Sequence, residues 1–179
     1  MMKRKYFHTQ ESRETKLTNP IKCIRDDAWL GEGYYLWCDV TDAEKWGQNA
    51  KKSTGYYEIY SCEIFEDRIL DTVFNETHYY FWLRQIEKVA RKIIEKTNQK
   101  PTLKELNDYF KERGTWDEVD GIKFQDLPSN PQALLVKPIQ YGTRKRVFAY
   151  RKRIQIAVYN IEIIANFTLL ARREVVDSR

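Results

Sequence analysis

The feature that most constrains the fold is a helical hairpin inside a chain whose other segments are typical of β-strands. From Thr77 to Lys96, apolar residues recur at spacings of three and four, which places one apolar stripe along an otherwise charged helix. A second helix follows Pro101, because Thr102 and Glu105 form a capping box in which each residue's side chain satisfies the other's backbone N–H group, and Gly114 ends this helix. The stripe of the first helix contains Trp82, Ile86, Val89, Ala90, Ile93 and Ile94, and that of the second contains Leu103, Leu106 and Phe110. We expect this hairpin, at about residues 77–114, to cover one face of a β-sheet.

Strand patterns stand on both sides of the hairpin. They cover residues 4–9, 34–37, 56–64, 68–73, 133–136, 147–159 and 167–170. Strand periodicity is clearest near the end of the chain, where alternate side chains point to opposite faces. One face there carries Ile154, Ile156 and Val158, and the other carries Gln155, Ala157 and Tyr159.

Shorter elements fill the remaining N-terminal part. Residues 21–30 carry apolar residues that predict a short helix or a turn before Gly31. Thr41 or Asp42 is the predicted N-cap of a short helix that runs through Trp46. No internal repeat or linker divides the chain, so we expect one domain over residues 1–179. The expected fold class is α+β, with two packed β-sheets, helices around them and the inserted hairpin.

Composition excludes several classes of protein. Hydrophobic residues make up 42% and aromatic residues 14% of the 179 residues, which is unlike a disordered chain. No apolar run approaches the ~20 residues needed to cross a bilayer, and the charged N-terminus lacks the apolar stretch of a secretion signal. The three cysteines form no CxxC pair and the chain has two histidines, so we expect no disulfide framework and no metal site. These features predict a soluble, cytoplasmic protein that makes no membrane contact.

A basic stretch stands out within the net charge of +5. Residues 144–153 hold six cations around Phe148 and Tyr150, and the cations are Arg144, Lys145, Arg146, Arg151, Lys152 and Arg153. Such a stretch is able to contact nucleic-acid phosphates while an aromatic ring stacks on bases. A strand whose ends are solvated by basic residues has the same composition. Both readings stay open.

The motifs indicate little when taken one at a time. Gly31-x-Gly33 lacks the third glycine of a dinucleotide fingerprint, since Leu36 occupies that place. No Walker lysine follows a glycine loop. The order of the motifs is more informative: a histidine at a strand end, a Gly-x-Gly turn into an aromatic strand, an Asp-Ala-x-x-Trp helix, and a late strand with one polar residue among β-branched ones.

This order resembles the His-Tyr-Glu branch of the ADP-ribosyltransferases, which includes diphtheria toxin, the poly(ADP-ribose) polymerases and small bacterial or phage toxin-like members. The resemblance implies an enzyme that uses NAD as its substrate. It places His8 at the adenosine-side ribose and Tyr35 on the nicotinamide, with Tyr34 as the adjacent choice, because only one of two neighbouring strand residues faces a pocket. It places Gln155 at the third catalytic position.

The same resemblance implies further contacts with NAD. Gly33 belongs to the turn before the stacking tyrosine, and Ala43 and Trp46 match the helix that backs the pocket. Thr9 offers its backbone groups to nicotinamide, where the family has a glycine. Lys22 and Arg25 are candidates to offset the pyrophosphate charge.

Two departures from the family pattern bear on the chemistry. The family's His-Gly-Ser/Thr is His8-Thr9-Gln10 here, which makes the fit around nicotinamide tighter. The third position is Gln155 instead of glutamate, and an amide does not act as a base. Glu162 is the nearest carboxylate in sequence, and it lies past the strand. The departures allow bond cleavage and a single transfer, and they argue against chain elongation.

The function that follows from the resemblance is NAD-dependent mono-ADP-ribosyl transfer to RNA, DNA or protein by a toxin or defence effector, with an antitoxin or inhibitor protein as a possible partner. NAD hydrolysis, with water as acceptor, is a variant of it. A catalytically inactive nucleic-acid-binding module is the alternative that the basic stretch and Gln155 favour. A third reading is an interaction domain that docks a partner on the 77–96 stripe, although such stripes usually pack on their own sheet.

Overall fold

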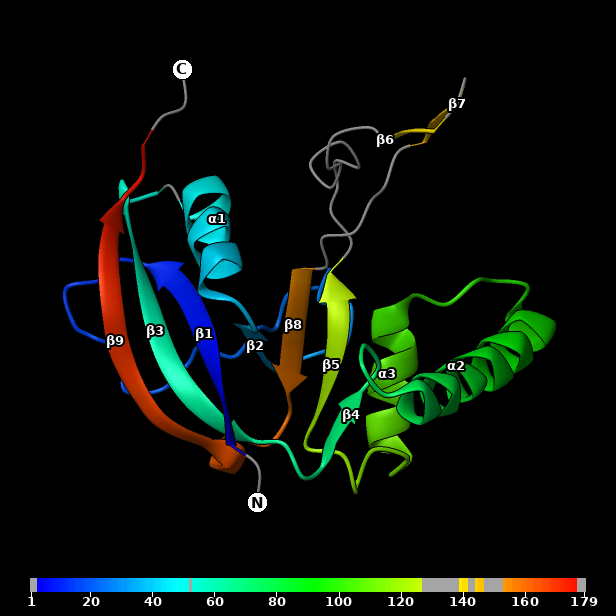
Figure 1. The fold of residues 1–179 in the computed structure, drawn as a ribbon. Coiled ribbons are helices and arrows are strands. Elements are labelled where there is room, and N and C mark those ends of the chain that lie inside the picture. Colours follow the sequence, from blue (N-terminus) through cyan, green and yellow to red (C-terminus); the bar gives the residue numbers. More distant parts are fainter. Residues whose placement is uncertain (1–2, 52, 127–138, 142–143, 147–152, 177–179) are drawn as a thin grey trace.

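The fold is a mixed α+β arrangement in which three helices pack against a seven-stranded sheet (Figure 1). The computed structural model describes residues 3–51, 53–126, 139–141, 144–146 and 153–176. The sheet has the order β4-β5-β8-β2-β1-β3-β9, and β4–β5 is its one parallel pair. Its strands are β1 (Lys3–Glu11), β2 (Tyr34–Trp37), β3 (Tyr56–Phe65), β4 (Ile69–Asp71), β5 (Gly121–Asp126), β8 (Arg153–Val158) and β9 (Ile164–Glu174). The helices are α1 (Val40–Ala50), α2 (Glu76–Thr97) and α3 (Leu103–Glu112), and a separate two-stranded ribbon pairs β6 (Ile139–Tyr141) with β7 (Arg144–Arg146).

The seven strands form one hydrogen-bonded sheet, so the prediction of two separate packed sheets was wrong. The sheet nevertheless has two halves, β1-β3-β9 and β4-β5-β8-β2, and one residue pair, Phe7↔Trp37, joins them. The two halves are joined by so few residues because β2 is short: all four of its residues pair with β8 on one edge, and only Trp37 pairs with β1 on the other edge. Figure 1 shows the two halves spreading apart beyond this junction, with α1 above it.

Consecutive side chains of β8 point to opposite faces of the sheet, as the alternation in the sequence predicted, and Ile156, Ala157 and Val158 are all buried. Ile156 and Val158 pack on one face with the fully buried Tyr6 and Leu36. Ala157 packs on the other face, in a core cluster under the helices. Because consecutive side chains of β8 enter different cores, Gln155 faces the same side as Ala157.

The helical hairpin is confirmed, and it covers the β4-β5-β8 half of the sheet. Thr102 and Glu105 form the predicted capping box, and Gly114 follows α3 with a φ of 71°. The residues that anchor the hairpin share one core cluster with Leu30 and Leu70, and they are Trp82, Ile86, Val89, Ala90, Ile93, Leu106 and Phe110. Leu103 and Ile94 are instead exposed, at the outer edge of their stripes.

Several local predictions were wrong. Residues 21–30 form turns, which is one of the two predicted alternatives, but Ile24 is 68% exposed and does not join the buried Ala28 and Leu30. The N-cap of α1 is Asp39, whose Oδ1 accepts the N–H of Thr41 at 2.7 Å. Strand β5 was not predicted. The strand predicted at 133–136 and the first part of the one predicted at 147–159 lie outside the described residues. In the described ranges, no helix is both long and apolar enough to span a membrane.

Candidate functional site

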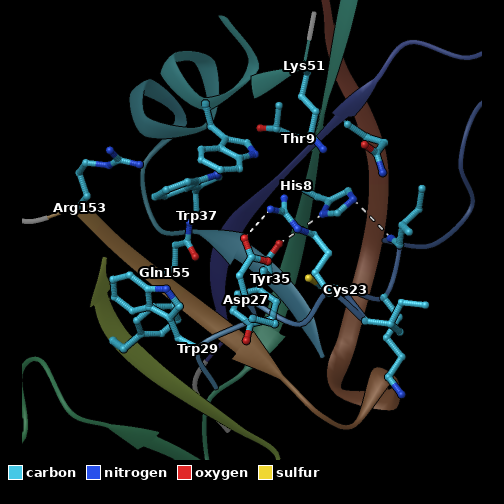
Figure 2. Close-up of a pocket in the computed structure, with 18 residues that line it drawn as sticks. His8, Thr9, Cys23, Asp27, Trp29, Tyr35, Trp37, Lys51, Arg153 and Gln155 are labelled. Atoms are coloured by element: carbon cyan, nitrogen blue, oxygen red, sulfur yellow. Dashed lines mark hydrogen bonds and ion pairs between the residues drawn. The ribbon is translucent and has the colours of Figure 1, made fainter. Parts of the chain in front are cut away.

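A cavity of about 610 Å³ opens where the two halves of the sheet separate. Its walls come from β1, β2, β5, β8, α1 and the loop of residues 12–33 that joins β1 to β2. Its size falls within the range of small-molecule and cofactor sites. The side chains of His8, Tyr35 and Gln155 all line this cavity (Figure 2). The resemblance predicted these three residues, and the fold brings them together from three neighbouring strands.

His8 is buried on β1 and uses both ring nitrogens within the protein. Nδ1 lies 3.3 Å from the carbonyl oxygen of Tyr35, and Nε2 lies 3.4 Å from the backbone nitrogen of Ile21. A carbonyl only accepts and an N–H only donates, so the proton resides on Nδ1 of a neutral imidazole. Burial lowers the pKa of His8 from 6.5 to about 4, which keeps the ring neutral at physiological pH.

Tyr35, and not Tyr34, is the tyrosine of the cavity. Its ring meets Phe124 edge-on with 6.2 Å between centroids. Its hydroxyl accepts the N–H of Leu30 at 3.1 Å and donates to the carbonyl of Gly31 at 2.8 Å. Tyr34 points to the other face of β2 and packs against the core around Tyr6. The hydroxyl of Tyr35 therefore fixes the loop that forms one wall of the cavity.

Gln155 lies on β8 in register with Trp37 on one side and Phe124 on the other. Its amide faces the cavity from the strand opposite His8. The amide can donate and accept hydrogen bonds at once, which suits the paired hydroxyls of a ribose.

The other predicted NAD contacts divide into two groups. Thr9 and Trp46 line the cavity, and Trp46 lies 6.0 Å from Trp37 between ring centroids. Ala43 is fully buried behind the wall, where its carbonyl accepts a hydrogen bond from the Thr9 hydroxyl at 2.9 Å. Gly33 and Tyr34 do not line the cavity. Gly33 is instead required for packing, because a Cβ there would stand 2.9 Å from the carbonyl oxygen of Val158.

Sequence reasoning missed a second set of residues that line the cavity. They are Cys23, Asp27, Trp29, Trp37, Lys51 and Phe124, and a further lining residue, Arg153, was predicted only as part of the basic stretch. They come from the 12–33 loop, from β2, β5 and β8, and from the end of α1, so contacts between distant segments bring them together. Within the sequence, the one local signal was the closeness of Asp27 and Trp29 to the Gly-x-Gly turn.

The cavity is rich in positive charge and aromatic rings. Its cations are Lys22, Arg25, Lys51 and Arg153, and its aromatic side chains are Trp29, Tyr35, Trp37, Trp46 and Phe124. The Arg153 guanidinium lies 5.0 Å from the centroid of the Trp37 ring. Burial lowers the pKa of Lys51. This lining is suited to a ligand that combines flat rings with phosphate groups.

The basic stretch meets the cavity at one described residue, Arg153. Arg144, Lys145 and Arg146 form β7, while Arg151 and Lys152 lie outside the described residues. The part of the chain that the structure describes contains no group of three side chains able to hold a metal ion.

Comparisons with protein-family models, with curated proteins and with solved structures found no match for this chain.

Proposed function

We propose that this protein is an enzyme that binds NAD in the cavity, breaks the bond between nicotinamide and ribose, and transfers one ADP-ribosyl group to a nucleic acid or a protein. The observation that carries the proposal is the convergence of His8, Tyr35 and Gln155 on one cavity. These residues are far apart in sequence, and their spatial grouping agrees with the roles that the ADP-ribosyltransferase resemblance gives them.

In this proposal the aromatic wall holds nicotinamide, with the ring of Tyr35 against its cationic face. Gln155 orients the ribose through its hydroxyls, and the cations of the cavity offset the charge of the pyrophosphate. The C–N bond breaks with its electron pair moving to nicotinamide, and the pocket stabilises the oxocarbenium-like ribose. A ribose hydroxyl that bonds Nε2 of His8 replaces the N–H of Ile21 there.

Modification of a macromolecule at the expense of NAD suits a toxin or a defence effector, and we propose that role. Induced expression in a bacterial host is expected to stop growth, and the Tyr35→Ala variant is expected to relieve the arrest.

Release of nicotinamide from NAD by the purified protein tests the proposal, with RNA, DNA or cell lysate present or absent. Tyr35→Ala is expected to abolish release, and Tyr34→Ala is the matched control on the opposite face of the same strand. Both variants must first show a cooperative unfolding transition. Quenching of tryptophan fluorescence by NAD reports binding directly, because Trp29, Trp37 and Trp46 line the cavity.

The outcomes separate the possible activities. Release that requires RNA, DNA or lysate identifies a transferase and its class of acceptor. Release without any of them identifies an NAD hydrolase. Absence of both release and NAD binding in the folded protein contradicts the proposal. Salt-sensitive binding of nucleic acid by such a protein would then favour the non-catalytic nucleic-acid-binding module.

A further inference from the structure

Activation of an acceptor needs a base, and the amide of Gln155 does not act as one. Among the described residues that line the cavity, Asp27 is the only one with a carboxylate. It belongs to the loop between β1 and β2 and not to β8. We propose, on the basis of the function proposed above, that Asp27 is the general base that accepts the proton of the attacking acceptor.

The loop around Asp27 is held in place by the cavity's own residues. Ala28 and Leu30 are 6% and 2% exposed, so the segment after Asp27 is anchored in the core. Backbone hydrogen bonds join Ala28 to Arg25 at 3.1 Å and Gly31 to Ala28 at 2.9 Å. The hydroxyl of Tyr35 bonds the backbone of the same turn at Leu30 and Gly31. The hydroxyl of Tyr35 therefore holds the end of the same loop segment that carries Asp27.

The position of Asp27 suits contact with an acceptor that enters from solvent. Figure 2 shows Asp27 close to Tyr35, with Gln155 and His8 around the same space. Its side chain is 66% exposed and forms an ion pair with the guanidinium of Arg25, which also lines the cavity. The guanidinium orients the carboxylate and offsets its charge next to the phosphates of NAD. The aromatic side chains contact the nicotinamide leaving group, and the exposed carboxylate of Asp27 faces the solvent from which the acceptor enters.

In the proposed transfer, Asp27 takes the proton of the acceptor X–H, and the acceptor atom forms a bond to the anomeric carbon of the ribose. The C–N bond to nicotinamide breaks, and its electron pair neutralises the pyridinium. The products are the ADP-ribosylated acceptor and neutral nicotinamide, and the proton on Asp27 passes to solvent. Gln155 keeps the ribose oriented throughout, which an amide does without titrating.

The test compares Asp27→Asn with Asp26→Asn, which removes the adjacent carboxylate that does not line the cavity. Asp27→Asn is expected to lower kcat for nicotinamide release about 100-fold or more, as loss of a general base does. The affinity for NAD, measured by tryptophan quenching, should stay within about twofold, because the amide retains the size of the side chain. Asp26→Asn should match the unmodified protein in both measurements.

Chemical rescue distinguishes catalysis from a structural role. Azide attacks the anomeric carbon without needing a base, so azide added to Asp27→Ala is expected to restore nicotinamide release and to yield ADP-ribosyl azide. Unchanged kcat in Asp27→Asn, in a protein that Tyr35→Ala inactivates, would overturn this inference and leave the proposed function standing. Loss of turnover that azide does not restore would overturn it too, because Asp27 would then act only through Arg25. A protein that neither binds nor cleaves NAD would overturn the proposed function itself.

Discussion

The backbone carbonyl of Tyr35 accepts a hydrogen bond from Nδ1 of His8 at 3.3 Å, while Nε2 of the same ring accepts the N–H of Ile21. One neutral imidazole thus ties together β1, β2 and the loop that walls the cavity. The histidine that the sequence marks for NAD binding also maintains the shape of the site. We therefore expect the protein to be sensitive to acid.

Protonation of His8 should destabilise the fold as the pH falls. Its pKa is lowered by burial from 6.5 to about 4, so the unfolded chain binds this proton first. Stability should therefore be unaffected by His8 above pH 6.5 and should decrease between pH 6.5 and 4, by about 3 kcal/mol at pH 4. Urea unfolding at pH 7, 5.5 and 4 measures this decrease. In His8→Gln, the free energy of unfolding should lack this decrease between pH 6.5 and 4. If the variant shows the same decrease as the unmodified protein, His8 is not its cause.

Removal of the Tyr35 hydroxyl should loosen the cavity wall without removing the ring. Tyr35→Phe leaves the N–H of Leu30 and the carbonyl of Gly31 without their partner, at a cost of about 1–2 kcal/mol. We expect a higher KM for NAD and a smaller effect on kcat, measured by nicotinamide release. Tyr34→Phe removes a hydroxyl from the opposite face of the strand and serves as the control. Equal KM values in the two variants would mean that the hydroxyl does not organise the site.

The sequence predicted those parts of the fold that depend on local chemistry. The hairpin follows from its helical periodicity and from the Thr102–Glu105 capping box, both of which act within a few residues. The alternation along β8 correctly predicted that its consecutive side chains enter different core clusters on opposite faces of the sheet. The common location of His8, Tyr35 and Gln155 at one cavity was expected because each sits in a short motif, and the order of these motifs along the chain resembles a known family.

The parts that depend on contacts between distant segments were not predictable in this way. A single sheet with a one-pair junction results from the lengths of β1 and β2 and from their pairing, which no local pattern specifies. Strand β5 carries Lys123, a buried cation that interrupts the apolar pattern expected of an inner strand. Asp27 and Arg153 enter the cavity through loop geometry and strand pairing, so their chemistry is visible only in three dimensions.

Lys123 should be the most costly single charge to remove. It is 1% exposed, and its ammonium lies 2.9 Å from Glu66 and 3.1 Å from Asp71, while the Tyr6 hydroxyl also bonds Glu66. Lys123→Met leaves these acids without their buried cation and should cost about 3–5 kcal/mol in urea unfolding.

The matched control for that variant is Lys3→Met, which breaks the exposed pair between Lys3 and Glu63 and should cost less than about 1 kcal/mol. Lys123 faces away from the cavity, since the next residue, Phe124, lines it. Folded Lys123→Met should therefore retain its affinity for NAD. A loss of stability no larger than that of Lys3→Met would show that the buried network is not stabilising.

The helical hairpin should influence the cavity through Lys111 of α3. Its ammonium donates to the carbonyl of Glu32 at 2.6 Å and lies 3.8 Å from the centroid of the Tyr159 ring. The hydroxyl of Tyr159 donates to the carbonyl of Leu30 at 2.9 Å, which links Lys111 to the loop that forms the cavity wall. Lys111→Met keeps the aliphatic stem and removes the charged donor, so the wall around Leu30 should loosen and KM for NAD should rise about fivefold, equivalent to ~1 kcal/mol. Burial lowers the pKa of Lys111 to about 8, so KM of the unmodified protein should increase above pH 8 as the ammonium loses its proton, whereas KM of Lys111→Met should not. Lys104→Met, on the same helix but paired with Asp108, should leave KM unchanged. If KM changes neither in Lys111→Met nor with pH, the hairpin covers the sheet and does not influence the cavity.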